Sequence, residues 1–479
     1  MPIPLIRQVG AGLAGLILAG TASACTGPSS PGPASSPASS PAAGTASTPV
    51  GSASAPGSAG RSSAAAAPGA AVTTEPVAAA AGWLVTQFEN GKHLPAPDGD
   101  HFDEKYGSTV YPDYGAEADV IFGLAAAKVG AAKIATALSY LRRHVAAYAG
   151  FGDPHGPYDG SIGKLALAAV VAGADPRHFA GHDLIGQLAR DECPAGASKC
   201  TPGSAANIYS SISESFVLLA EARAGHQPTP RAVAYLLSLQ CPAGGFPDGV
   251  KPCTGAADDD ATAYAIMALQ AAGGHRSAVR RASRWLAGER TTGGYWVSQH
   301  RPNVNTTGLA AAALAGAGQD LSATRRWLLA QQVPAGSPGA GAFRYGGKIV
   351  PTTTSATSPS VLATAQAIPA LVPDGSLATL TASGAAAGAP VFPPTVTTAG
   401  TIHAGSVAHV TGVGFAAGER VELSLAPDAR PVAGATADAL GTVRFAAAVP
   451  DSTAGGSHDL TLTGVSSGLT AQHAVTVTR

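Results

Sequence analysis

The sequence repeats itself between Thr74 and Leu371, and this repeat restricts the fold more than any other feature. A unit consists of an amphipathic helix, a turn with glycines and an aromatic residue, a polar cluster and an alanine-rich helix. Clear turns are Gly244-Gly245-Phe246 and Gly293-Gly294-Tyr295. The alanine-rich helices of five units begin near Asp119, Lys164, Ser213, Thr262 and Thr306, at intervals of 45, 49, 49 and 44 residues, and a sixth begins near Ser360. Repeats of this period form solenoids or closed rings, so the sequence predicts twelve helices in six pairs.

Composition assigns the two helices of a unit to different layers. The alanine-rich helices are apolar on all sides, as in the run from Ala263 to Leu269, which is typical of helices that are buried all round. The first helices are amphipathic, with Arg280, Arg281 and Arg284 on one polar face. Six inner helices inside six outer ones close a ring without an exposed edge. We therefore expect a mainly α protein with an α6/α6 toroid.

Two motifs make a family resemblance specific. The stretch from Gln240 to Phe246 and the run Asp258-Asp259-Asp260-Ala261-Thr262-Ala263 resemble the prenyltransferase and squalene-oxidase repeat. That repeat builds the toroid of terpenoid cyclases, protein prenyltransferases, complement-type thioester domains and the cobalamin carriers related to intrinsic factor. The resemblance covers residues 75–375 and implies the toroid, but the same fold carries several functions.

The amino ends of the inner helices are expected to gather at one mouth of the ring. Polar residues and free backbone N–H groups at such ends favour a polar ligand. The predicted ligand-binding residues are Asp119, Asp258, Asp259, Asp260, Asn303 and Asn305. For Ser211, Thr306 and Thr352 the alternative role of helix N-cap is preferred.

Three adjacent carboxylates exceed the need of one helix cap. In squalene-hopene-type terpenoid cyclases a similar acidic motif holds a proton donor, and the resemblance places Asp260 there, supported by Asp258. Ala261 departs from the motif, and aromatic residues that would shelter a carbocation make up only 5% of the chain. A zinc prenyltransferase site and a thioester motif are absent from the sequence, and no metal site is predicted.

These observations led to the interpretation of the toroid as a monomeric binding module without catalysis. Its ligand would be a small molecule, a cofactor or a cell-wall polymer, and the cofactor is unknown. The alternatives are a terpenoid cyclase that uses Asp260 and a cobalamin-carrier-like protein.

The amino-terminal segment predicts export. Residues 1–24 combine Arg7, an apolar run and the small residues Ala22-Ser23-Ala24 before Cys25, as in a secretory signal peptide. Cys25 is either lipidated, which would make the membrane a partner, or the free first residue of a secreted protein. Residues 25–74 are rich in Ser, Pro and Ala and are predicted to form a disordered tether. Even cysteine numbers in an exported chain favour disulfides, and the local pairs Cys193 with Cys200 and Cys241 with Cys253 are preferred.

The carboxyl-terminal residues follow a different pattern. After a linker at 376–394, residues 395–479 alternate apolar and polar side chains in short segments, which predicts an Ig-like β-sandwich. The formal net charge of −1, with only 12% charged residues, argues against a nucleic-acid partner.

Overall fold

A computed structural model describes residues 71–88, 92, 94, 114–298, 300–346 and 360–479. The predicted signal peptide, Cys25 and nearly all of the predicted tether lie outside these residues. Within them, no helix has the length and apolar character needed to cross a membrane.

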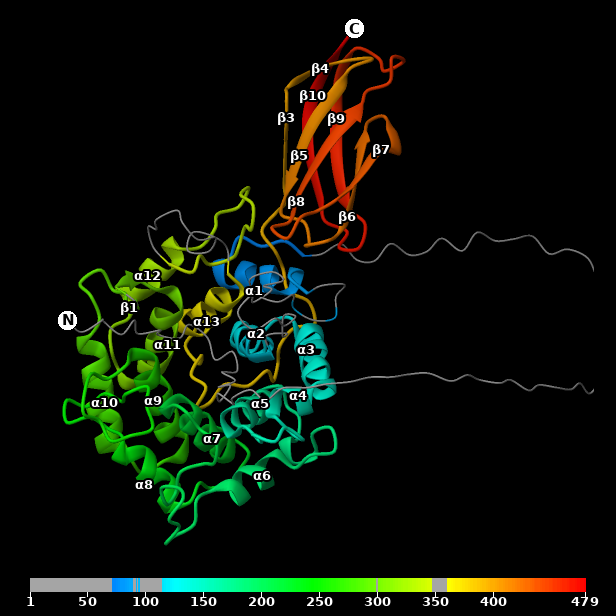
Figure 1. The fold of residues 1–479 in the computed structure, drawn as a ribbon. Coiled ribbons are helices and arrows are strands. Elements are labelled where there is room, and N and C mark those ends of the chain that lie inside the picture. Colours follow the sequence, from blue (N-terminus) through cyan, green and yellow to red (C-terminus); the bar gives the residue numbers. More distant parts are fainter. Residues whose placement is uncertain (1–70, 89–91, 93, 95–113, 299, 347–359) are drawn as a thin grey trace, which may run out of the picture. The chain divides into compact units, whose positions relative to one another are not determined.

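Six helices form the inner ring of the helical part (Figure 1). They are α2 (Tyr114–Ala127), α5 (Asp159–Val171), α7 (Ser211–Arg223), α9 (Asp259–Ala272), α11 (Val304–Leu314) and α13 (Val361–Leu371). Each packs against the next, and α13 packs against α2, so the ring is closed. Every residue of α11 is buried, as expected for a helix with neighbours on all sides.

The outer helices alternate with the inner ones along the chain. They are α1 (Pro76–Thr86), α3 (Ala131–Arg143), α4 (Val145–Ala149), α6 (Leu184–Asp191), α8 (Pro230–Ser238), α10 (Arg276–Gly288) and α12 (Ser322–Ala330). The 3₁₀ turns η1 (Pro176–His178) and η2 (Ala315–Ala317) and the two-residue strands β1 (Val297–Ser298) and β2 (Arg301–Pro302) lie between them. The described residues thus hold thirteen α-helices, one more than predicted, because the short α4 follows α3.

Glycines in the repeated turns dock each unit onto the next outer helix. Gly244, Gly294 and Gly341 have positive φ values of 114°, 88° and 96°. A Cβ atom at these positions would lie within 2.7–2.8 Å of the backbone of α10, α12 and α1 respectively. The last of these contacts joins the sixth unit to the first helix. Gln332 reinforces it, because its Nε2 donates to the carbonyls of Gly341 (2.9 Å) and Pro76 (2.8 Å).

A threonine in the first turn of an inner helix fixes the aromatic residue of each clear turn. The backbone N–H groups of Phe246, Trp296 and Phe343 donate to the hydroxyls of Thr262 (2.8 Å), Thr307 (3.0 Å) and Thr364 (2.8 Å). All three aromatic side chains are fully buried. The polar cluster of the repeat therefore contains a structural hydroxyl as well as a helix cap.

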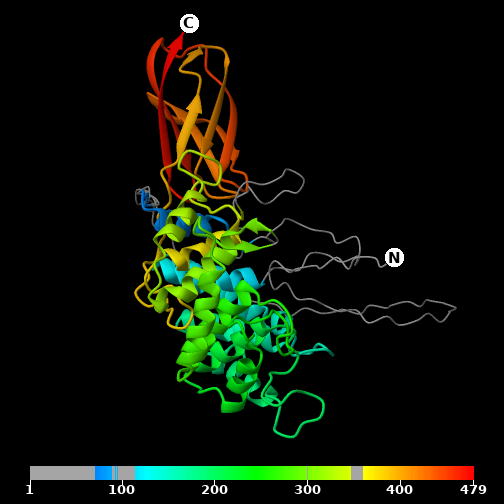
Figure 2. The same ribbon diagram turned by 90° about the vertical axis from the view of Figure 1, so that its left-hand side faces the viewer.

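The carboxyl-terminal part is a separate β region, as predicted, and its strands are drawn in orange to red in Figure 2. The strands are β3 (Thr395–Thr398), β4 (Thr401–His403), β5 (Val407–Val413), β6 (Arg420–Leu425), β7 (Asp428–Thr436), β8 (Thr442–Ala448), β9 (Gly456–Gly464) and β10 (Thr470–Thr478). They form a five-stranded sheet in the order β4-β10-β9-β6-β7 and a three-stranded sheet in the order β3-β5-β8. Alternating side chains of both sheets share one apolar core, which includes Val421, Phe445 and Leu462.

Candidate functional site

The lumen of the inner ring contains a small cavity with a partly polar lining. Its volume is about 20 Å³, which is enough for one water molecule. The lining residues come from α2, α9, α11, α13 and the segment after α13. They are Asp119, Phe122, Tyr264, Met267, Leu309, Ala312, Ala365, Gln366, Pro369, Gly375 and Leu377.

An ion pair crosses the lumen between two inner helices. The Nζ of Lys164 on α5 lies 2.9 Å from Oδ2 of Asp119 on α2, and both side chains are buried. The Nε2 of Gln366 donates to the same carboxylate oxygen at 3.4 Å. The ammonium group of Lys164 also lies over the ring of Phe216, 5.5 Å from its centroid.

Asp260 faces the same lumen from the first turn of α9. It lies four and seven residues before Tyr264 and Met267, which line the cavity, and this spacing places all three on one helix face. Burial, and then the negative charge of Asp258, raise the pKa of Asp260 to about 7, although a hydrogen bond with Thr306 acts in the opposite direction. Its Oδ1 is inaccessible to solvent and has no hydrogen-bond partner among the described residues.

Tyr264 connects the two carboxyl groups. Burial, followed by the charges of Asp119 and Asp260, raises its pKa well above the usual value for tyrosine. Its ring also packs on Phe216 at a centroid distance of 4.7 Å. The lumen therefore combines one ion-paired carboxylate and one carboxyl group whose pKa is raised to about 7.

Asn305 adds a second unsatisfied acceptor. It precedes the cavity residues Leu309 and Ala312 by four and seven positions on α11 and therefore shares their face. Asn305 is only 7% exposed, and its Oδ1 has no hydrogen-bond partner among the described residues. Buried amides normally have partners, so this atom is suited to a ligand or a water molecule.

The six predicted ligand-binding residues thus divide into two groups. Asp119, Asp260 and Asn305 lie on lumen faces. Asp258 is the N-cap of α9 and accepts a hydrogen bond from the Ala261 N–H (2.9 Å), and Asn303 caps α11 through the Thr306 N–H (3.0 Å).

Asp259 differs from Asp260 in its charged neighbours. Burial, followed by the charges of Asp258 and Glu289, raises its pKa to about 7, and Glu289 directly follows the outer helix α10. Its Oδ1 is also inaccessible to solvent and has no hydrogen-bond partner among the described residues, so the ligand-binding role of Asp259 stays a prediction.

The predicted capping residues require a correction. Ser210 and Asn303, not Ser211 and Thr306, are the N-caps of α7 and α11, because their side chains accept the first free N–H groups. Thr352 lies outside the described residues.

Sequence reasoning missed the roles of Tyr264, Phe216 and Gln366. Tyr264 follows Asp260 by one helical turn, and this spacing could have indicated that the two share a face. Gln366 and Phe216 had no comparable signal, because their helices give no clue to which face meets the lumen.

The lumen is closed at the carboxyl ends of the inner helices by the segment that follows α13. Gly375 and Leu377 line the cavity from this side. Arg223, at the end of α7, donates to the carbonyls of Leu377 and Leu380, and the Ala382 N–H donates to the carbonyl of Val171 at the end of α5 (2.8 Å).

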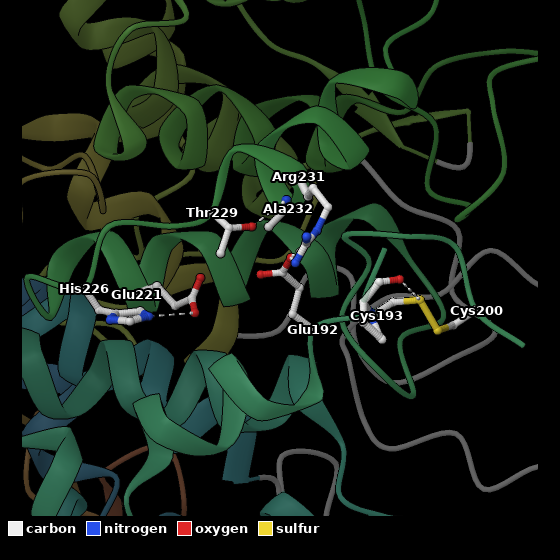
Figure 3. A network of polar contacts seen from close by, with 9 residues as sticks. Glu192, Cys193, Cys200, Glu221, His226, Thr229, Arg231 and Ala232 are labelled. Carbon is white, nitrogen blue, oxygen red and sulfur yellow. Dashed lines mark hydrogen bonds and ion pairs between the residues drawn. A yellow bond between two sulfur atoms is a disulfide. The ribbon is translucent and has the colours of Figure 1, made fainter. Parts of the chain in front are cut away.

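A second group of acidic residues lies between the two rings, near the loop of the first disulfide (Figure 3). Oε2 of Glu214 accepts from the Ala205 N–H (3.1 Å), and burial raises the pKa of Glu214 to about 8. Burial and the Asp191 carboxylate raise the pKa of Asp159 to about 9.

Two ion pairs in Figure 3 lie next to these carboxyl groups. Glu192 contacts Arg231 at 3.1 Å, and Glu221 lies 3.8 Å from Nε2 of His226. Glu192 and Glu221 both contribute to the raised pKa of Glu214, so the group is electrostatically connected.

The two predicted disulfides are confirmed. Cys193 bonds to Cys200, and Cys241 bonds to Cys253. Disulfides persist in oxidising compartments, and both bonds fit an extracytoplasmic location. In the described part of the chain, no cluster of three or more His, Cys, Asp or Glu residues is arranged to hold a metal ion.

Comparison with known proteins gives structural similarities only. No protein-family profile matches the chain, and no curated protein sequence matches it. An unsaturated glucuronyl hydrolase from Streptococcus agalactiae is similar with 10% identity and a TM-score of 0.38, over 62% of this chain and 89% of that one. A Salmonella alpha-2-macroglobulin is similar with 10% identity and a TM-score of 0.30, over 77% of this chain but only 30% of its own length.

These comparisons correct the predicted function. The sequence led us to expect a toroid that binds a ligand without catalysis. That prediction is wrong by this comparison, because the first of the two structures is an enzyme, a glucuronyl hydrolase.

Proposed function

We propose that the toroid is an extracytoplasmic hydrolase that cleaves a glycosidic bond with Asp260 as proton donor and Asp119 as base. One observation carries this proposal: two carboxyl groups lie on lumen faces in different surroundings, one buried beside other acidic residues and one paired with a lysine. Asp260 has a pKa of about 7 and can donate a proton, whereas Asp119 is paired with Lys164. In many glycosidases, two carboxyl groups in different surroundings serve as the acid and the base of the reaction.

The reaction would be a simple hydrolysis. Asp260 would protonate the oxygen of the leaving group as its bond to carbon breaks. Asp119 would take a proton from a water molecule, whose oxygen forms the new bond to the same carbon. The cavity beside Asp119 holds about 20 Å³, the size of one water molecule.

The surroundings support a sugar as the substrate. The ring of Tyr264 lines the cavity and offers an apolar surface, and the amides of Asn305 and Gln366 offer hydrogen bonds to hydroxyl groups. The lumen is closed at its far end, so only the end of a glycan chain would reach Asp119. The proposed enzyme therefore removes terminal sugars and does not cut within long chains.

The test measures sugar release from cell-wall glycans and 4-nitrophenyl glycosides by the full chain. We expect activity to fall as pH rises through about 7, because Asp260 must carry its proton. Asp260→Asn is expected to lower kcat by roughly 10²–10⁴-fold, the usual contribution of a general acid. Asp259→Asn is the matched control, because this neighbouring carboxyl group has no role in the proposed reaction, and it should retain activity.

A second measurement does not depend on finding the substrate. Infrared difference spectra of the wild type and Asp260→Asn would follow the carboxyl band of Asp260 across a pH titration. A midpoint near 7 supports the proton-donor role. A midpoint near 4 would rule it out, as would undiminished hydrolysis by Asp260→Asn.

We further infer that the helical domain belongs with the prenyltransferase and squalene-oxidase type of repeat, supported by the repeated turns at Gly244, Gly294 and Gly341. The domain limits 75–375 and 395–479, the Ig-like character of the β region and the monomeric state are proposals of the same kind. So is export through a signal peptide ending at residue 24. Mass spectrometry of the mature amino terminus would distinguish a diacylglyceryl group on Cys25 from a free cysteine.

A further inference from the structure

The outer helix α10 carries an unusual concentration of positive charge. Its thirteen residues include Arg276, Arg280, Arg281 and Arg284 and no acidic residue. All four arginines are exposed. Arg281 donates to the side chains of Gln240 and Ser277, but the other three form no ion pair or hydrogen bond among the described residues.

The three unpaired arginines form one line. Arg276, Arg280 and Arg284 are four residues apart, so they lie on the same helix face, about 6 Å from one to the next. We call these three residues the arginine stripe. The outer ring places α10 at the edge of the helical part (Figure 1), so the stripe faces away from the lumen.

The positive charges of the arginine stripe destabilise α10 when nothing is bound to it. Like charges four residues apart on a helix repel one another. Arg276 is the first residue of α10, where the helix dipole also disfavours a cation, and the first turn has no acidic residue to compensate.

We propose that the arginine stripe is a docking surface for a linear anionic polymer that carries one phosphate or carboxylate group on each repeating unit. Guanidinium groups bind such anions in a bidentate manner, and their regular spacing fits a chain with regularly spaced charges. An anionic bilayer fits less well, because none of the exposed large apolar residues lies on α10. This surface is distinct from the proposed catalytic lumen, and its role does not depend on the hydrolase proposal.

Long-chain polyphosphate is the probe for this surface, and binding to the full chain is measured by fluorescence anisotropy at several salt concentrations. The test variant combines Arg276→Gln, Arg280→Gln and Arg284→Gln. It should bind at least about tenfold more weakly at low salt, and its log–log salt dependence should be less steep by about 2, since three ionic contacts are lost. The matched control removes the same charge from other exposed outer-ring positions with Arg142→Gln, Arg143→Gln and Arg190→Gln, and it should bind like the wild type. Thermal unfolding of both variants checks that each is folded.

Three results would overturn the proposal. The stripe variant could bind polyphosphate as well as the wild type, or the control could lose as much affinity as the stripe variant. The wild type could also bind phosphatidylglycerol vesicles more tightly than polyphosphate, which would assign the surface to a membrane. Weaker binding in the stripe variant alone supports the polymer.

Discussion

Replacement of Glu214 by glutamine should make the helical domain more stable at alkaline pH. Glu214 lies on α7 between the two rings, is fully buried and accepts a hydrogen bond from the Ala205 N–H at 3.1 Å. Glutamine keeps the shape and the accepting oxygen but cannot ionise. The substitution therefore removes the cost of a buried charge and leaves most of the packing unchanged.

The size of the effect follows from the raised pKa. Burial raises the pKa of Glu214 from 4.5 to about 8, and each unit corresponds to about 1.4 kcal/mol. A group whose pKa is raised by folding stabilises the folded state below its unfolded pKa and loses that contribution as pH rises through its folded pKa. The wild type should therefore lose up to about 5 kcal/mol between pH 4 and pH 9 at this residue, and Glu214→Gln should not.

Tryptophan fluorescence in urea is a suitable assay. All four tryptophans, Trp83, Trp285, Trp296 and Trp327, belong to the helical domain, so unfolding of the β region does not contribute to the signal. The free energy of unfolding is measured at pH 5, 7 and 9. Glu75→Gln, which removes an exposed carboxylate before α1, is the matched control and should follow the wild type at every pH.

The expected pattern is near equality of wild type and Glu214→Gln at pH 5, with a gap that widens in favour of the variant at pH 7 and pH 9. Asp159 remains in the variant, and its pKa of about 9 leaves some loss of stability at high pH. Equal slopes of stability against pH in the two proteins would show that Glu214 is ionised in the folded state at neutral pH and would refute the reasoning.

Three further substitutions test the packing of the rings through thermal unfolding. Thr307→Val should destabilise the domain by about 1–3 kcal/mol, because it leaves the buried N–H of Trp296 without its acceptor. Thr324→Val should be neutral or stabilising, since the buried hydroxyl of Thr324 has no partner in the described residues. Equal effects of the two would contradict this account. Gly308→Ala should lower the free energy of unfolding by about 1–3 kcal/mol, because a Cβ atom there would lie 2.3 Å from the carbonyl oxygen of Gln366. An unchanged melting temperature would contradict this prediction and would show that α11 and α13 can move apart at no cost.

The alternation of helices was predictable from the sequence because the repeat encodes it twice, in hydrophobic pattern and in turn chemistry. The aromatic turn residue, the polar cap and the alanine-rich run all point to the same local structure. The short helix α4 was not predicted. In the structure α3 ends at Arg143, and the short α4 begins at Val145.

The candidate site was predictable only in part. Polar residues before each inner helix were visible, but most of them are caps, as Asp258 and Asn303 show. Lumen residues such as Gln366 lie deeper in their helices and depend on how each helix is rotated about its axis. The rotation of each helix about its axis depends on packing between units that are far apart in the sequence. A single sequence does not reveal this packing.

The contact of the last repeated turn with α1 has a consequence for folding. The hydrogen bond from Gln332 to Pro76 joins residues 256 positions apart. An open array of repeats can gain or lose units at its ends, but this ring has no ends, and its first helix lacks its proper neighbour until the sixth unit has been synthesised. Contacts of such sequence separation slow folding. A chain truncated before the sixth unit lacks Gly341, so the face of α1 that this turn covers has no partner in the same molecule. Association of truncated chains through that face would be the natural misassembly of this fold.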